Sequence, residues 1–163
     1  RIDRDKWVYV DTQGNEHPVN RNDFSVTLNN EKITFSAVFN AIHGTPGEDG
    51  YLQAYFQLIG LPLTGCSMYA SALTFNKRDM LSVLKPFGIL SAPSYYLNKG
   101  EKYQTAQIVK KVGLPCFVKA NKSGSSIGVY KVNEENQLSE AIQNAFQYDN
   151  EILIESYLKG MYF

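Results

Sequence analysis

Cysteine is scarce in this 163-residue sequence, and the two examples, Cys66 and Cys116, stand among apolar residues. Neither belongs to a Cys-x-x-Cys or Cys/His spacing. This usage argues against a disulfide framework and against a zinc site, because both need paired or closely spaced ligands. We therefore predict reduced thiols in a cytoplasmic protein.

An excess of either charge is also lacking, because sixteen basic residues balance sixteen acidic ones. No basic patch indicates a nucleic-acid partner, and a charged ligand must be held by local geometry rather than by the overall field. No stretch approaches the roughly 18 apolar residues that span a bilayer, so no membrane segment is predicted. The chain opens at Arg1 rather than at methionine, so the lack of a visible signal peptide carries little weight.

The first part of the chain has the pattern of one piece of a doubly wound sheet. Residues 1–30 alternate polar and apolar around two turn signals, which predicts short hairpin strands. The β-branched and aromatic run 33–42 predicts a buried strand that feeds a glycine-rich loop, 43–50. Helical spacing in 52–59 and a strand-like exit at 61–65 complete a strand–helix–strand unit, which favours a parallel sheet.

Beyond a boundary that we place near Gly65–Cys66, the pattern predicts a small α+β unit. Its helices and strands alternate at short spacing, and two strands are connected as a hairpin. The predicted elements are a helical stretch at 67–87, a strand at 89–97, a helix at 101–112, strands at 116–119 and 129–132, a helix at 137–148 and a strand at 151–155.

Lys119 and the loop after it carry the strongest chemical signal. A strand ends in this lysine and continues into Ser123-Gly124-Ser125-Ser126-Ile127-Gly128. The ammonium supplies a point charge, and the loop amides and hydroxyls supply hydrogen-bond donors, which together suit a polyphosphate. The spacing is not that of a Walker A loop, in which the lysine follows the glycines. An ordinary hairpin with a solvated turn is the alternative, and the residues alone leave both readings open.

His43, Glu48 and Asp49 lie in the glycine-rich loop predicted at the carboxyl end of a strand, where open α/β sheets bind ligands. Histidine can donate a hydrogen bond to developing negative charge, and Glu48 can orient it. Glu48 and Asp49 can equally cap the following helix, because negative charge suits a helix N-terminus. Both interpretations stay open.

Two further features are weak by themselves. The apolar strand Ile152–Glu155 leads into Ser156-Tyr157-Leu158, whose backbone amides and carbonyls can read an adenine edge as a hinge does. Most such strands, however, are only core. Lys77 stands on a predicted helix, where a lysine is more often solvated than functional.

Several motifs follow one another in a fixed order over roughly residues 33–160. They are His43-Gly44-Thr45-Pro46-Gly47-Glu48-Asp49-Gly50, Gly60-Leu61-Pro62-Leu63-Thr64-Gly65, Ala70-Ser71-Ala72 to Asn76-Lys77, Gly113-Leu114-Pro115-Cys116-Phe117-Val118-Lys119, Gly124-Ser125-Ser126-Ile127-Gly128 and Ile154-Glu155. In this order they resemble the D-alanine–D-alanine ligase family of the ATP-grasp superfamily, and the stretch 20–25 resembles its Bacteroidetes members.

The resemblance implies a fold and a reaction. The fold is α/β, with a partial Rossmann-like (pre-ATP-grasp) N-terminal domain at 1–65, an α+β ATP-grasp central subdomain at 66–155 and the start of the C-terminal ATP-grasp subdomain at 156–163. The reaction is the ATP-dependent ligation of two D-alanines to D-alanyl-D-alanine through an acyl phosphate, for peptidoglycan synthesis. The resemblance also implies a homodimer.

By matching position, the resemblance assigns site residues. Catalytic roles go to His43, Glu48 and Ser125, and ATP-binding roles go to Lys77, Lys119, Ser125, Ser126, Glu155, Ser156 and Leu158. The ligands of Mg²⁺ and the grip on the first D-alanine are expected outside this chain. The chain alone is therefore expected to be an inactive internal fragment, and no metal ligand is named.

Three residues depart from the family pattern. Ala120 replaces a proline, Ser156 replaces a common lysine, and Tyr162 stands where a ribose-binding glutamate is expected. The residues that usually select the second substrate in this family are expected outside this chain. A ligase that uses D-lactate or D-serine therefore stays open. A non-catalytic, truncated nucleotide-binding fragment is the alternative of another class.

Overall fold

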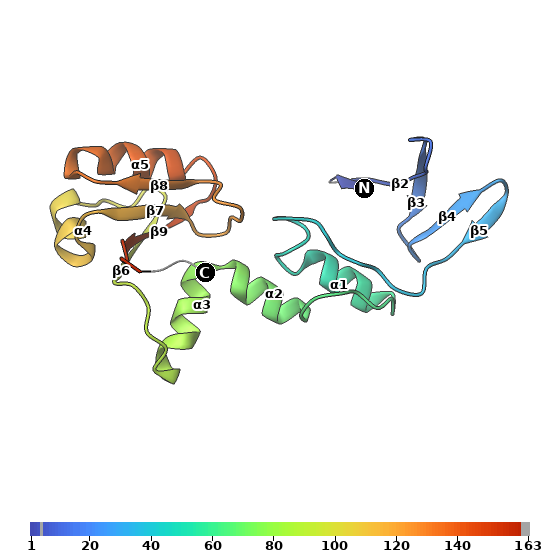
Figure 1. The fold of residues 1–163 in the computed structure, drawn as a ribbon, viewed down its shortest axis with the longest axis horizontal. Helices are drawn as coiled ribbons and strands as arrows, with labels where there is room; N and C mark the ends of the chain where they lie inside the picture. The colour runs from blue at the N-terminus through green and yellow to red at the C-terminus, as the bar shows by residue number, and fades with distance from the viewer. Residues whose placement is uncertain (4, 161–163) are drawn as a thin grey trace.

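Two antiparallel sheets stand at opposite ends of the elongated molecule, and helices α1 (Tyr51–Leu58) and α2 (Met68–Phe75) lie between them (Figure 1). This computed structural model describes residues 1–3 and 5–160, so Tyr162 lies outside the described residues. No helix within these residues has the length and apolar character needed to cross a bilayer. The elements make a mixed α/β fold.

The first sheet is a meander of short strands, which confirms the hairpins predicted from the opening residues. In the last of its turns, between the fourth and fifth strands, Asn29 (φ 50°) and Asn30 (φ 66°) both adopt the left-handed conformation that a tight hairpin turn requires. The strands pair in the order of the sequence. They are β1 (Ile2–Asp3), β2 (Lys6–Val10), β3 (Glu16–Asn20), β4 (Ser25–Leu28) and β5 (Glu31–Ile33).

Aromatic side chains join this sheet to α1. Phe24 meets Phe56 edge to face with ring centroids 4.7 Å apart, and Trp7 meets Tyr55 in the same manner at 4.8 Å. Edge-to-face pairs at such distances are favourable beyond their burial. Phe56 is 1% exposed, so it anchors the helix in the way its spacing in the sequence predicts.

The predicted buried strand at 33–42 is wrong. Residues 34–37 and Phe39 are exposed, and within the described residues the run pairs at two points: Ile33, the end of β5, pairs with Val26, and Val38 forms a parallel bridge with Leu63. A β-rich run forms a strand only where neighbouring chains accept and donate its backbone hydrogen bonds. Here the Val38 backbone bonds to Pro62 and Thr64, so the expected parallel unit shrinks to that bridge.

The predicted helical stretch at 67–87 is confirmed, with a break at Asn76. This residue ends α2 with extended backbone (ψ 99°), and its side chain accepts a hydrogen bond from the Asp79 amide at the start of the next helix. Asparagine competes with helix backbone for hydrogen bonds, so it favours such a junction. The following elements are α3 (Lys77–Leu84) and the 3-10 turn η1 (Lys85–Phe87).

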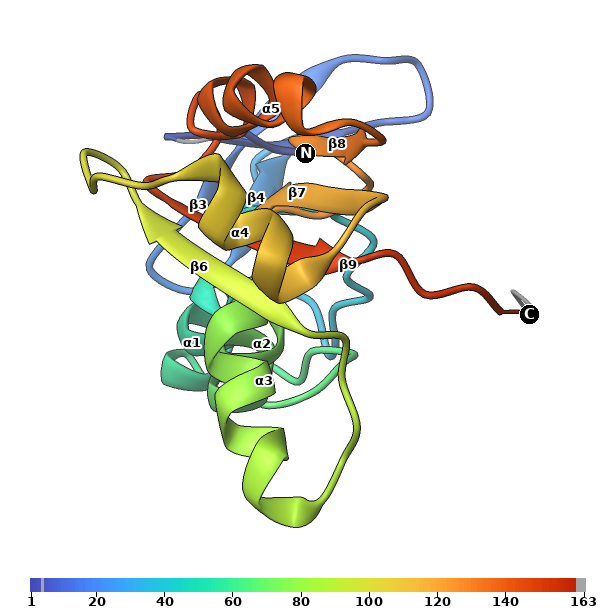
Figure 2. The ribbon, with the colours of Figure 1, turned by 90° about the vertical axis from the view of Figure 1, so that its left-hand side faces the viewer.

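The second sheet has the strand order β6-β9-β7-β8, all antiparallel. Apolar residues alternate along β7, so one face is buried under two helices, and Figure 2 shows α4 crossing in front of the strands. The predicted strand at 89–97 begins only at Ser94. The elements are β6 (Ser94–Asn98), α4 (Thr105–Val112), β7 (Cys116–Ala120), β8 (Val129–Val132), η2 (Glu135–Gln137), α5 (Leu138–Ala145) and β9 (Glu151–Ser156).

Candidate functional site

The two loops that the sequence singles out meet in one cleft of about 180 Å³. Residues His43–Thr45 form one wall, and Lys122–Ser125 with Ile127 form another. Phe75, the last residue of α2, completes the lining. The histidine loop (residues 43–50) and the serine loop (residues 123–128) are about 80 positions apart in the sequence. They nevertheless face each other across this cleft, as two parts of one binding site must.

The histidine loop, residues 43–50, folds tightly against the residues that precede it. A Cβ added at Gly47 would lie 2.3 Å from the Ile42 carbonyl oxygen, so no other residue fits there without a backbone shift. The Gly47 carbonyl oxygen accepts hydrogen bonds from the side-chain amides of Asn40 and Gln53, both at 2.7 Å. These contacts fix the loop that presents His43.

Glu48 and Asp49 make different contacts. Asp49 accepts a hydrogen bond from the amide of Tyr51 (3.3 Å), the first residue of α1, but the N-cap position is Gly50 and no side chain among the described residues caps this helix. Glu48 turns back into the loop: Oε2 accepts from the Gly44 amide at 2.6 Å, and Oε1 lies 3.9 Å from Nδ1 of His43. The His43 side chain is 83% exposed, so it is accessible to a ligand.

The serine loop has an unusual backbone. Ser125 (φ 49°) and Ser126 (φ 60°) are both left-handed, at a cost of roughly 1–2 kcal/mol per residue. Both side chains are exposed, so burial does not offset this cost. A Cβ added at Gly124 would lie 3.0 Å from Oε2 of Glu48, which shows how closely the two loops approach. Strain held in an exposed loop beside a cleft points to a binding role for the loop.

Lys77 reaches this loop from α3. Its Nζ donates hydrogen bonds to the carbonyl oxygens of Ala120 (3.1 Å), Asn121 (3.2 Å) and Ser123 (2.6 Å). Burial, and after it the positive charge of Lys119, lowers the pKa of Lys77. The structure therefore brings the two predicted phosphate lysines into the same neighbourhood, at the base of the serine loop.

Lys119 and Glu155 lie on the face of the second sheet that α4 and α5 leave uncovered. Their side chains form an ion pair and are about a quarter exposed each. The Lys119 Nζ also lies 5.4 Å from the centre of the Phe117 ring. A lysine beside a carboxylate and an aromatic ring, on an open sheet face, can meet both the charged and the flat part of a nucleotide.

Ser156 and Leu158 lie farther along the chain, away from the cleft lining. The Ser156 hydroxyl donates hydrogen bonds to the carbonyl oxygens of Val112 (2.5 Å) and Pro93 (3.3 Å), which ties β9 to neighbouring segments. Leu158 follows β9 and is 61% exposed. Any contact of these residues with a ligand remains a prediction.

Sequence reasoning missed Asn121, which comes directly after β7. It is 1% exposed, the most buried of the polar side chains described. Its residue type carried no signal, because an asparagine after a strand is typical of a turn. Among residues 1–3 and 5–160, no group of three or more His, Cys, Asp or Glu side chains is arranged to hold a metal ion.

Comparison with known families identifies the family to which these loops belong. The family model described as "D-ala D-ala ligase N-terminus" matches residues 2–66, and the model described as "D-ala D-ala ligase C-terminus" matches residues 83–163. The chain belongs to the D-alanine–D-alanine ligase family. The resemblance inferred from the motifs is thereby confirmed.

Individual relatives agree with the family assignment. The D-alanine–D-alanine ligase of Flavobacterium johnsoniae is 67% identical over 98% of this chain and 49% of that protein, and the one of Christiangramia forsetii is 54% identical over 95% and 48%. Among solved structures, D-alanyl-alanine synthetase A from Vibrio cholerae superposes with a TM-score of 0.81 at 32% identity, covering 91% of this chain and 46% of that one. The VanG D-Ala:D-Ser ligase from Enterococcus faecalis gives 0.77 at 33%, covering 92% and 45%. The chain spans about half the length of the curated relatives it matches.

Proposed function

We propose that this chain is part of an enzyme that joins two D-alanines to D-alanyl-D-alanine at the expense of ATP, for peptidoglycan synthesis. One observation carries the proposal: in a chain of this family, the histidine loop and the serine loop line one cleft, with Lys77 at its base. That arrangement suits a reaction in which a phosphoryl group and a carboxylate must meet.

The proposed reaction has two steps. A carboxylate oxygen of the first D-alanine attacks the γ-phosphorus of ATP, a new P–O bond forms, and the bond to the β-phosphate oxygen breaks to release ADP. The amine of the second D-alanine then attacks the acyl phosphate carbon. The tetrahedral intermediate expels phosphate, and the amine loses its proton as the peptide bond forms. Charge builds on the transferring oxygens in both steps, so fixed donors are what such a site must supply.

The side chains of this chain supply such donors. Lys77 and Lys119 hold phosphate oxygens, Lys77 by exchanging bonds to backbone carbonyl oxygens for bonds to phosphate. Ser125 and Ser126 close over the phosphates from the strained loop. His43 faces the reacting carboxylates, oriented by Glu48. Glu155 is proposed to line the adenine with Ser156 and Leu158, the last through its backbone amide.

Magnesium has no ligand set among the described residues, so the steps above assign it no role. The family resemblance implies the ion, and it also implies that the magnesium ligands lie outside this chain. The domain limits at 65 and 155, a cytoplasmic location and a homodimer belong to the same proposal.

A second candidate is ligation of D-alanine to a different second substrate. The VanG D-Ala:D-Ser ligase superposes nearly as well as the D-alanyl-alanine synthetase, so the shared fold does not select the second substrate. D-lactate is the other candidate. Supplying each amino or hydroxy acid in turn, and weighing the product by mass spectrometry, decides among the three.

The main test is phosphate release from ATP, with and without D-alanine, by this chain and by the product of its complete reading frame. We expect D-alanine-dependent turnover by the complete product and none by the chain alone. If neither turns over, the ligase proposal is wrong and a nucleotide-binding or structural role replaces it.

Two variants locate the chemistry. Replacing Lys119 by methionine removes a charged phosphate donor, which is worth about 1.5–3 kcal/mol, and should raise KM for ATP by about 10- to 100-fold. His43→Ala should lower kcat by about a hundredfold, as loss of a donor to developing charge does. Lys102→Met is the matched control, because Lys102 is exposed and remote from the cleft lining, and it should behave as wild type.

A further inference from the structure

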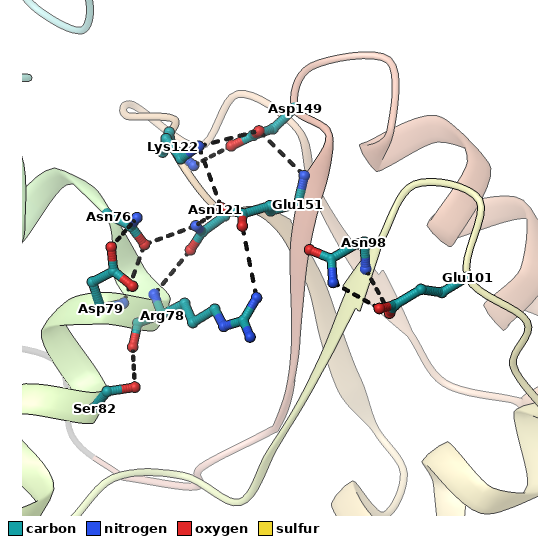
Figure 3. A network of polar contacts seen from close by, with 10 residues as sticks. All are labelled: Asn76, Arg78, Asp79, Ser82, Asn98, Glu101, Asn121, Lys122, Asp149 and Glu151. Carbon is teal, nitrogen blue, oxygen red and sulfur yellow. Dashed lines mark hydrogen bonds and ion pairs between the residues drawn. The ribbon is translucent and has the colours of Figure 1, made fainter.

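The side-chain amide of Asn121 is buried, and both its oxygen Oδ1 and its nitrogen Nδ2 have hydrogen-bond partners (Figure 3). Oδ1 accepts from the Arg78 backbone amide at 2.9 Å, and Nδ2 donates to Oδ1 of Asn76 (2.8 Å) and to Oε2 of Glu151 (3.0 Å). An amide has one accepting oxygen and two donating hydrogens, so the partners leave a single orientation for it. Because it is buried and bonded to three partners, the Asn121 side chain is held in one position.

Asn121 bonds to three consecutive residues: Asn76, which caps α3, and Lys77 and Arg78, the first two residues of that helix. Asn76 and Arg78 flank Lys77, and the Lys77 backbone amide itself donates to the Asn121 carbonyl oxygen at 3.4 Å. The first turn of α3 is therefore attached to the end of β7 through one asparagine. Asn76 also caps α3, so the start of the helix and its attachment depend on the same side chain.

A second set of contacts holds Asn121 from the opposite side. Its backbone amide donates to the Glu151 carbonyl oxygen at 3.0 Å, while the Glu151 carboxylate lies 3.6 Å from Arg78 and 3.3 Å from Lys122. Figure 3 shows these side chains converging from α3, the β7 end and β9. The attachment thus joins three elements and has no single hinge about which α3 could swing.

We infer that Asn121 is a positioning residue that sets where the Lys77 ammonium stands relative to Lys119 and the serine loop. This inference rests on the proposed function, because it is the phosphate groups of ATP that would meet both lysines. Asn121 itself touches no substrate. Without the Asn121 side-chain amide, Lys77 would keep its charge. Its two neighbours, Asn76 and Arg78, would lose the hydrogen bonds that hold them to Asn121.

The residue type matters for this role. Asn121→Asp would keep the acceptor for the Arg78 amide and the shape of the side chain. It would also turn a carboxylate toward the Glu151 carboxylate and the Asn76 oxygen, where two donors stood. Like charges at that separation repel, so we expect Asn121→Asp to be at least as damaging as Asn121→Ala.

A double-mutant cycle with Lys77 tests the inference in the product of the complete reading frame. In the wild-type background, Asn121→Ala should raise KM for ATP about tenfold and change kcat less, since it weakens positioning of a binding group. In the Lys77→Met background the same change should alter KM by less than about twofold, because the group that it positions is gone. A merely structural loss would raise KM equally in both backgrounds.

Asn98→Ala is the matched control. Asn98 also donates through its side-chain amide, to Glu101 at 2.7 Å (Figure 3), but it stands on β6, and no hydrogen bond among the described residues joins it to Lys77. The KM of the Asn98→Ala variant for ATP should stay within about twofold of the wild-type value. Should Asn121→Ala fail to fold by circular dichroism, Asn76→Ala removes one partner of Asn121 and takes its place in the cycle.

The outcomes separate the two levels of the argument. Additive effects of Asn121→Ala and Lys77→Met, with D-alanine-dependent turnover intact in the wild type, overturn the positioning role and leave the ligase proposal standing. No D-alanine-dependent turnover by the wild type overturns the proposed function, and the inference with it. Loss of the Asn121 effect in the Lys77→Met background supports both.

Discussion

Gly128, the last residue of the serine loop, should tolerate no side chain. Its backbone is left-handed (φ 68°), and an added Cβ would lie 2.9 Å from the Cβ of Ala120 and 3.1 Å from the ring of Tyr148. Its carbonyl oxygen accepts from the Ala120 amide at 2.9 Å, so the loop cannot move away without breaking that bond. Gly128→Ala therefore combines an unfavourable backbone conformation with a clash.

The magnitude follows from a comparison with Gly100, which is also left-handed (φ 90°) but has nothing within 4 Å of an added Cβ. The backbone term, roughly 1–2 kcal/mol, applies to both positions. Crowding in a packed site adds about 1–3 kcal/mol at Gly128 alone. We expect Gly128→Ala to lose about 2–5 kcal/mol of unfolding free energy, and Gly100→Ala about 1–2 kcal/mol.

Urea unfolding followed by far-UV circular dichroism measures both values, and equal slopes of the two transitions would show that the unfolded states are comparable. The entropy that alanine removes from the unfolded chain is the same in both variants, so it cancels in the difference. Equal losses at the two positions would refute the reasoning, because they would mean that the tight contacts around Gly128 carry no energy.

Two further predictions concern stability. Ile108 on α4 is 0% exposed in the core beneath the second sheet, so Ile108→Ala should cost about 2–5 kcal/mol in the same urea assay; a loss below about 1 kcal/mol would mean that the core collapses around the deletion. Asp23 differs in kind: hydrogen bonds from Lys32, and after it Ser25, lower its pKa to about 2. The unfolded chain then takes up the proton first, so the stabilisation by Asp23 is present above about pH 4 and is lost as the pH falls through about 2. The difference in unfolding free energy between wild type and Asp23→Asn should shrink over that range, and a constant difference would contradict the assigned pKa.

Short-range pattern predicted most elements of the second half correctly. Cys116–Ala120, with its alternating burial, is a strand because every second side chain fits under a helix. The helix predicted at 137–148 forms over Leu138–Ala145, and its apolar residues fill the core that its spacing predicts. These elements find their partners within the same small unit, so local sequence is enough to place them.

The strand prediction at 33–42 is wrong because most of this run finds no pairing partner in the part of the chain that the structure describes. Its composition is that of a strand, but a strand exists through its neighbours, and among the described residues the run pairs only where Ile33 ends β5 and where Val38 forms its bridge to Leu63. The break at Asn76 shows a related limit. A helix pattern continues through this residue, while the chain turns there because the side chains of Asn76 and Asn121 bond to each other.

The residue types and spacing alone determined the chemistry on offer in this protein: a lysine before a serine-rich loop, a histidine in a glycine-rich loop, and the family to which both belong. The residue types decide which charges and hydrogen-bond donors exist, and the order of the motifs can be read from a single sequence. Tertiary structure alone decided that Glu48 approaches Gly124, that the Lys77 ammonium bonds to three backbone carbonyl oxygens at and just after the end of β7, and that the buried Asn121 side chain bonds to both neighbours of Lys77. Those contacts join residues tens of positions apart, and their geometry depends on how the two sheets and the helices pack together, which no local pattern encodes.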